Sequence, residues 1–176
     1  YSAGQEGAIK KTNKDGVLLW TYTGSNVMRC VAVNRDGSSI YCGGADQAVR
    51  KLNSSGGLVW SFTGHTNTVH SVAVDSNGYV YSTGGDNRVK KINSSGGQVW
   101  NFGDLTGAGY GVAVNPDPSN SYEKNYVYAC AADATVRGIN CNGKQAWSMT
   151  RHDSIVYGLA VASSGEVYSA SHDGTI

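Results

Sequence analysis

The sequence predicts an all-β fold, and three observations lead to that expectation. The 176 residues include 24 glycines but only 2 prolines. Short runs of Val, Ile, Tyr, Ser and Thr are separated by turn residues, which is typical of many short strands. No stretch keeps an apolar period of about 3.6 residues for several turns, so we expect essentially no helix.

Composition excludes several classes of protein. With 40% hydrophobic residues, 15% charged residues and a net charge of +1, the chain has enough apolar material for a core. These values do not fit a disordered tail or a basic arm for nucleic acid. No apolar run approaches the roughly 18 to 20 residues that cross a bilayer, so no membrane insertion is expected.

Aromatic residues recur at a fixed interval and reveal an internal repeat. The tryptophans are spaced by 40, 40 and 47 residues, at Trp20, Trp60, Trp100 and Trp147. A series of tyrosines has the matching spacings of 40, 40, 47 and 40 residues, at Tyr1, Tyr41, Tyr81, Tyr128 and Tyr168. The seven extra residues fall in the segment 115–125, which holds both prolines and reads as an enlarged loop.

Each period contains four short strands joined by turns. In one copy the strands are expected at 68–75, 79–84, 88–93 and 98–102, which predicts an antiparallel meander. The last hairpin is the most regular, because an Asn precedes a Gly by three residues in every copy. Its members are Asn13, Asn53, Asn93 and Asn140. Asn at the first position and Gly at the fourth fit a type I turn that ends in a left-handed glycine.

A sheet of about 40 residues cannot bury both faces alone, so the copies must stack. Four-stranded units at this period predict a β-propeller, in which the recurrent Trp is a buried wedge between blades. We therefore expect residues 1–176 to form a single propeller: a partial blade at 1–22, full blades at about 27–62, 68–102 and 109–150, and a partial blade at 154–176.

The ring is expected to be incomplete. The chain should begin in the second strand of one blade and end in the third strand of another, and YSAGQEGAI at the start matches YSASHDGTI at the end. A ring of four blades, closed by joining the two ends of the chain, would therefore contain that segment of a blade twice. We infer part of a longer propeller of about seven blades, or a ring completed by another chain.

One segment resembles the WD40 family. The stretch 64–93 carries the Gly-His pair, the apolar first strand, the Ser of the second strand and the Asp of the next turn. The WD dipeptide itself is absent. The fourth strand GGLVWSF is similar to the tryptophan-docking repeats of quinoprotein-type propellers.

The WD40 resemblance implies a buried hydrogen-bond relay in two blades. The two sets are His65, Ser82 and Asp86, then His152, Ser169 and Asp173. Where Ser25 or Leu105 replaces the His, the Ser position has become Cys42 or Ala129. This co-occurrence is what a satisfied buried network requires, so a structural role is favoured over a catalytic triad. We expect no catalytic residue and no enzyme activity.

Motifs for metals and cofactors are weak throughout. The four cysteines, Cys30, Cys42, Cys130 and Cys141, lack zinc spacing, and we favour free buried thiols over a Cys30–Cys42 disulfide. The segment 138–145 fits GxxxxGK, but Gln145 stands where a magnesium-binding hydroxyl is needed. No metal, cofactor or cofactor-binding residue is expected.

Basic residues concentrate on the third strands. The set is Lys10, Lys11, Arg50, Lys51, Arg88, Lys90, Lys91 and Arg137. Such a belt could bind a nucleic-acid backbone. The basic residues are equally explained if these strands are partly solvated outer strands, where Lys and Arg discourage pairing with another strand edge. With a net charge near zero, nucleic acid is not favoured as a partner.

The favoured function is a non-enzymatic interaction or structural scaffold that binds a protein partner through rim loops. The most divergent loops, 103–110 and 115–125, supply the candidate contacts Asp104, Tyr110, Tyr122 and Lys124. A glycan-binding propeller with one pocket per blade is the alternative, and it requires exposed Trp or Tyr beside Asn or Asp. A fragment of a quinoprotein-like enzyme is disfavoured, because its calcium-binding acids and catalytic Asp cannot be located.

Overall fold

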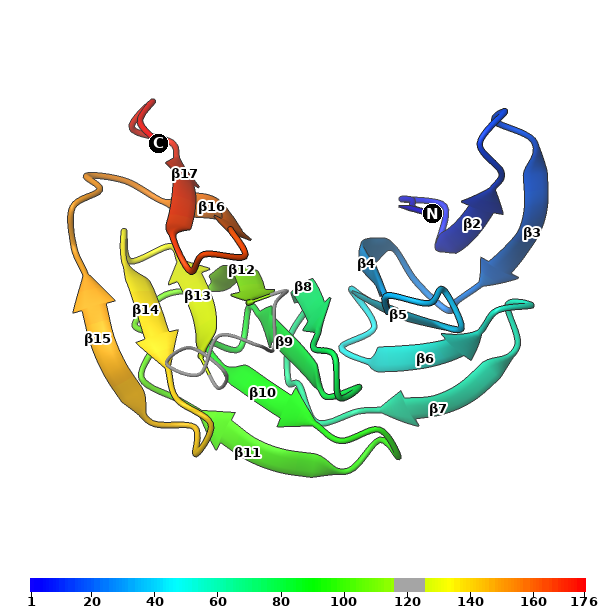
Figure 1. Cartoon of the computed structure of the whole chain (residues 1–176), viewed down its shortest axis with the longest axis horizontal. Helices are drawn as coiled ribbons and strands as arrows, with labels where there is room; N and C mark the ends of the chain where they lie inside the picture. Colours follow the sequence, from blue (N-terminus) through cyan, green and yellow to red (C-terminus); the bar gives the residue numbers. More distant parts are fainter. Residues whose placement is uncertain (116–125) are drawn as a thin grey trace.

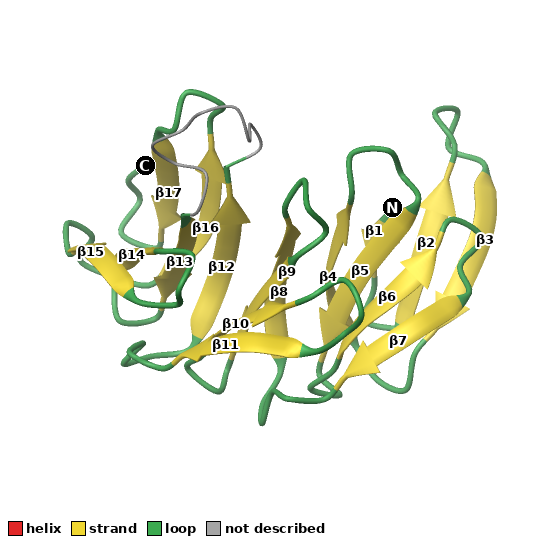
Figure 2. Cartoon of the chain, turned by 60° about the horizontal axis from the view of Figure 1, so that its bottom comes forward, coloured by secondary structure: helices red, strands yellow, loops and turns green. Residues whose placement is uncertain are grey.

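Five antiparallel sheets follow one another along the chain. The computed structural model describes residues 1–115 and 126–176, and no helix occurs in these two segments. Figure 1 shows the sheets fanned into an open arc, and Figure 2 shows that strands and loops make up the drawn chain. The predicted all-β fold of four-stranded units is therefore confirmed.

Every complete sheet is a meander whose strands keep chain order. The first sheet contains β1 (Ser2–Ala3), β2 (Ala8–Thr12) and β3 (Leu18–Thr23). The second contains β4 (Met28–Val33), β5 (Ser39–Gly44), β6 (Val49–Asn53) and β7 (Leu58–Phe62). The third contains β8 (Val69–Val74), β9 (Val80–Gly84), β10 (Val89–Ile92) and β11 (Gln98–Phe102). The fourth contains β12 (Gly109–Val114), β13 (Val127–Ala131), β14 (Val136–Ile139) and β15 (Gln145–Met149). The fifth contains β16 (Val156–Val161) and β17 (Val167–Ser171).

The end of the chain differs from the expectation. Residues 172–176 form a turn and a short extended segment, so the predicted third strand of the last sheet is absent. A strand needs a hydrogen-bonded neighbour along its length. Only Thr175 and Ile176 follow the turn, which is too short a segment to pair along β17.

The closing hairpins form because asparagine side chains order the turns. The Oδ1 atom of Asn53 accepts hydrogen bonds from the backbone N–H groups of Ser55 at 3.0 Å and Gly57 at 2.8 Å. Gly56 has a φ of 84°, a left-handed conformation that suits glycine. The same pair of Asn bonds recurs in the other three closing hairpins.

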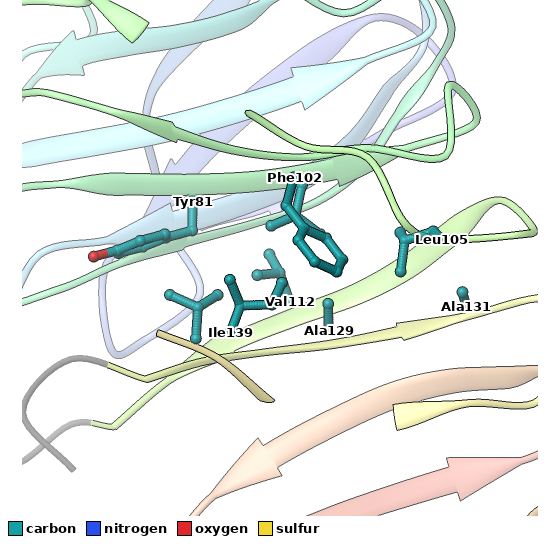
Figure 3. Close-up of a cluster of buried hydrophobic side chains, with 9 residues drawn as sticks. Tyr81, Phe102, Leu105, Val112, Ala129, Ala131 and Ile139 are labelled. Carbon is teal, nitrogen blue, oxygen red and sulfur yellow. The ribbon is translucent and has the colours of Figure 1, made fainter. Parts of the chain in front are cut away.

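The core lies between successive sheets. Between the third and fourth sheets, Tyr81 and Phe102 face Val112, Ala129 and Ile139 (Figure 3). All five side chains are buried. At the junctions between the first four sheets, aromatic side chains of one sheet pack against mainly aliphatic side chains of the next, and stacking buries both faces of an inner sheet.

The tryptophans pack differently from the expected buried wedge. Trp20, Trp60 and Trp100 are half-buried, and Trp147 is 39% exposed. Trp60 lies over Gly96 in the turn of the next sheet, where an added Cβ would come within 3.1 Å of the ring. Its indole N–H also donates to the Ser94 carbonyl at 3.0 Å. One ring face is thus covered by a neighbouring turn, and Trp147 meets no such turn in the described chain.

The cysteines are free, and their strand positions explain why. Cys30 pairs with Gly43 and Cys42 with Val31, so the two side chains point to opposite faces of one sheet. Burial raises the pKa of Cys42 to about 12. The expectation of buried thiols is wrong for Cys141, which is exposed in a turn.

Burial predicts a large difference between two leucines of one hairpin. Leu52 is fully buried, whereas Leu58 on the adjoining strand is 52% exposed. Leu52→Ala should lower the free energy of unfolding by about 2 to 5 kcal/mol, because it leaves a cavity between sheets. Leu58→Ala should change it by less than about 0.5 kcal/mol. Urea unfolding of both variants tests this, and equal losses would contradict the packing described.

Candidate functional site

Two sheets bring the predicted relay residues together. In the third sheet, His65 Nδ1 lies 2.9 Å from Asp86 Oδ2, and His65 Nε2 lies 2.8 Å from Ser82 Oγ. In the fifth sheet, the matching distances from His152 are 2.9 Å to Asp173 and 2.7 Å to Ser169. A carboxylate only accepts, so the Nδ1–H group of each His donates to its Asp, and the Nε2 atom forms the hydrogen bond with the Ser hydroxyl.

These relays lie inside the sheets. His65 is 3% exposed and Ser82 is fully buried. A substrate could reach the Ser82 hydroxyl only if the packing around it opened. The arrangement therefore ties a loop to a turn and a strand, and it satisfies polar groups that burial would otherwise penalise.

The other two complete sheets hold the same turn aspartate by different means. Asp46 accepts from the Ser25 hydroxyl at 2.8 Å and pairs with Arg50 at 2.5 Å. Asp133 accepts from the Thr106 hydroxyl at 2.8 Å and pairs with Arg137 at 2.9 Å. An arginine four residues later thus replaces the histidine, so the turn and the preceding loop are joined in each complete sheet.

The contacts of these aspartates set the direction of their pKa values. Burial acts to raise the pKa of Asp133, but hydrogen bonds from Arg137, Thr135 and Thr106 outweigh burial and hold it well below its usual range. The same balance lowers the pKa of Asp86, where His65 supplies the main hydrogen bond. Both carboxyl groups are therefore held in the charged form.

The third-strand lysines and arginines are mostly engaged within their own sheets. Lys91 Nζ lies 5.4 Å from the ring centre of Tyr81, and Lys51 lies 5.8 Å from that of Tyr41. Lys10 pairs with Glu6 at 2.8 Å. Together with the aspartate pairs of Arg50 and Arg137, these contacts occupy much of the basic belt, so it is not a free electropositive surface.

A different set of residues lies along the inner edge of the arc. The first strands of four sheets, β4, β8, β12 and β16, line this concave edge in Figure 1. Each of these strands has a β-bulge at its second residue. That residue has no partner on the neighbouring strand, and the register shifts across it. The bulged residues, which we call the axial row, are Arg29, His70, Tyr110 and Tyr157.

The aromatic part of the axial row is continuous across the third, fourth and fifth sheets. The ring centres of His70 and Tyr110 are 5.0 Å apart, and those of Tyr110 and Tyr157 are 5.2 Å apart. His172, in the turn after β17, extends the row at 6.3 Å from Tyr157. Ring contacts at these separations hold the side chains against one another.

The row has a charge at one end. Burial lowers the pKa of His70, and the positive charge of Arg29 lowers it further, which favours the neutral imidazole. Arg29 is exposed, and no carboxylate of the described residues pairs with its guanidinium. The row therefore presents one cation followed by uncharged rings.

Of the four predicted contact residues, the structure describes Asp104 and Tyr110. Tyr110 lies in the middle of the axial row, and exposed Asp104 lies in the loop that leads into the same strand. Tyr122 and Lys124 fall outside the described residues. Sequence reasoning missed Arg29, His70 and Tyr157. The signal was present, because these positions differ from copy to copy while the Ala-Val that ends each first strand repeats.

The two described segments contain neither a metal-binding cluster nor a membrane-spanning helix. No group of three His, Cys, Asp or Glu side chains there could hold a metal ion. No helix there could cross a membrane.

Comparison with protein families agrees with this architecture. The family model described as outer membrane protein assembly factor BamB matches residues 45–176, which is three quarters of the chain. The chain belongs to this family. A WD domain, G-beta repeat model matches residues 16–51, so the resemblance to both kinds of propeller repeat is confirmed. No curated protein gave a significant match.

The two family matches divide the chain unexpectedly. The BamB-family match includes both His-Ser-Asp relays, although the resemblance to WD40 repeats was drawn from the first of them, at 64–93. The WD match instead covers strand β3, which contains Trp20, then β4 and β5 and the start of β6. Because the two repeats share one four-stranded plan, a relay alone does not separate them.

The lowered pKa values predict loss of stability in acid. A carboxyl group whose pKa is depressed on folding contributes stability above its unfolded pKa of about 3.9, and that contribution is lost as the pH falls. The free energy of unfolding should therefore drop as the pH falls below about 5, and the drop should continue to about pH 2. Asp133→Asn should flatten this decline, because it removes one of the depressed groups.

The matched control is Asp104→Asn, which changes an exposed loop carboxyl group to the same amide. It should leave the pH dependence close to that of the unmodified chain. Urea unfolding across the pH range is the measurement. A pH dependence unchanged by Asp133→Asn would show that the Arg137 pair contributes nothing to acid sensitivity.

Proposed function

We propose that the chain is a non-enzymatic interaction scaffold that binds a protein partner at the loop-bearing end of its concave edge. The observation that carries this proposal is the axial row. Four sheets place Arg29, His70, Tyr110 and Tyr157 at one equivalent position, which is three kinds of side chain, whereas the Ala-Val that ends each first strand repeats in every copy. A surface that differs from copy to copy on a repeated frame suits recognition of one asymmetric partner.

The surrounding structure supports rigid presentation of this surface. Loops such as that of Thr106 are tied to the Asp133 turn, and the loop of His65 is tied to Asp86. Side chains on a fixed frame lose little further entropy when a partner binds. The description of the family as an outer membrane protein assembly factor is consistent with a scaffold role.

The glycan-binding alternative has less support. It requires an equivalent open aromatic pocket in every blade, but Trp20, Trp60 and Trp100 each have one ring face covered by a glycine turn. Only Trp147 of this series is exposed. Multivalent glycan binding through repeated tryptophan pockets would therefore have few accessible pockets.

Site-specific photo-crosslinking tests the scaffold proposal. A photoreactive phenylalanine analogue replaces Asp104 or Tyr157, and the protein is irradiated in extract of its source organism. We expect discrete protein adducts at both positions, because Tyr157 belongs to the axial row and exposed Asp104 lies in the loop that leads into β12. The control position is Val59, which is similarly exposed but lies on the outer strand β7. Tyr110→Ala should reduce the adduct formed from position 104.

Adducts that form equally at Val59 would show that capture does not depend on the concave edge. The absence of discrete adducts at both Asp104 and Tyr157 would also contradict the proposal.

A further inference from the structure

The free cation of the axial row indicates the charge of its partner. Arg29 is exposed without a carboxylate partner among the described residues, whereas Arg50 and Arg137 are paired with Asp46 and Asp133. The charge of Arg29 is felt at His70, the next residue of the row, and an arginine with unused donors is well suited to a carboxylate, which it can bind through two parallel hydrogen bonds. Charge complementarity at this end of the row therefore favours an acidic group.

The rings of the axial row indicate which groups of the ligand must lie beside its acidic group. His70 and Tyr110 are half-buried and Tyr157 is 50% exposed, so each keeps an accessible face. Their mutual contacts leave no slot for a planar group to insert between them. A ligand must instead lie across the row and pack apolar or ring-shaped groups against it.

The spacing of the rings fits an extended polypeptide. Successive ring centres are 5.0 and 5.2 Å apart, and an extended chain advances about 3.3 Å per residue. The aromatic part of the row thus spans about three residues of an extended segment. Proline or an aromatic residue would supply rigid apolar surface over that length at low entropic cost.

A nucleic-acid strand fits the same row less well. Binding a phosphate backbone needs several free cations along its path. Lys10, Arg50 and Arg137 are paired with carboxylates, and Lys51 and Lys91 lie over tyrosine rings. Arg29 alone supplies a positive charge within the four-residue row, which favours a peptide with one acid over a polyanion.

We propose that the axial row binds an extended peptide segment. An Asp or Glu carboxylate of this peptide binds Arg29. A proline or aromatic ring, within about three residues of that acid, packs on Tyr110 and Tyr157. This inference rests on the proposed scaffold function and adds the chemistry of the partner. It assigns Arg29 to charge selection and the two tyrosines to selection of the neighbouring apolar residue.

Selection from a random linear peptide library displayed on phage tests this proposal. The unmodified chain should enrich peptides with an acid close to a proline or aromatic residue. Arg29→Glu should lose that acidic preference and enrich basic residues at the same place. The control is Arg35→Glu, which makes the same charge change in the exposed turn at the other end of β4 and should keep the acidic consensus.

Affinity of a selected peptide gives the second readout. By fluorescence anisotropy, Arg29→Gln and Tyr110→Ala should each weaken binding by about tenfold, and Asn in place of the peptide acid should do the same to the unmodified chain. Circular dichroism and thermal unfolding establish that each variant remains folded. A labelled single-stranded oligonucleotide is tested in parallel.

Several results would overturn the inference: an enriched consensus without an acid, a consensus unchanged in Arg29→Glu, no enrichment at all, or tighter binding of the oligonucleotide than of the peptide. These results differ from failure of the scaffold proposal, which is judged by crosslinks at Asp104 and Tyr157 whatever the sequence of the partner.

Discussion

Contact between a tryptophan ring and a glycine turn of the next sheet is the constraint on which the arc depends. Trp20, Trp60 and Trp100 lie over Gly56, Gly96 and Gly143, and an added Cβ would approach the rings to between 2.8 and 3.1 Å. Each indole N–H also donates to a carbonyl of that turn at 3.0 Å. The contact fixes the outer edge of one sheet against its neighbour, while the aliphatic core sets the spacing further in. Together they determine how far apart the inner strands, and so the axial row, must lie.

A second constraint acts at the loop-bearing end of the sheets. A charged aspartate in the turn before the third strand is held by a histidine in one complete sheet and by an arginine in two others. Both solutions give a carboxylate a hydrogen-bonded partner where burial would otherwise favour its neutral form. The loops that lead into the inner strands are tied down in each case. The bulged residues on those strands can therefore differ without loss of the frame.

The parts of this structure that were predictable are those that repeat in the sequence. The asparagine turns and the four strands of each copy follow from local chemistry and from the period, and the residues of the two relays follow from the resemblance to WD40 repeats. The half-buried state of the tryptophans was not predictable in this way, because it depends on a glycine that belongs to the next sheet. The axial row escaped prediction for a different reason: a β-bulge breaks the alternation from which the facing of a strand residue is inferred. Comparison of the four copies at Arg29, His70, Tyr110 and Tyr157 would have revealed the variable position, but not that the rings touch.

The most direct test of the tryptophan contact compares Gly96→Ala with Gly16→Ala by urea unfolding. Both glycines have a left-handed φ, 89° and 81°, so both substitutions carry the same backbone strain of about 1 to 2 kcal/mol. A Cβ at Gly96 would press on the ring of Trp60, whereas one at Gly16 would meet no atom within 4 Å. The account predicts that Gly96→Ala lowers the free energy of unfolding by at least about 1 kcal/mol more than Gly16→Ala does. Equal losses would contradict it, because they would show that the turns carry only local strain and that the ring contact does not hold successive sheets together.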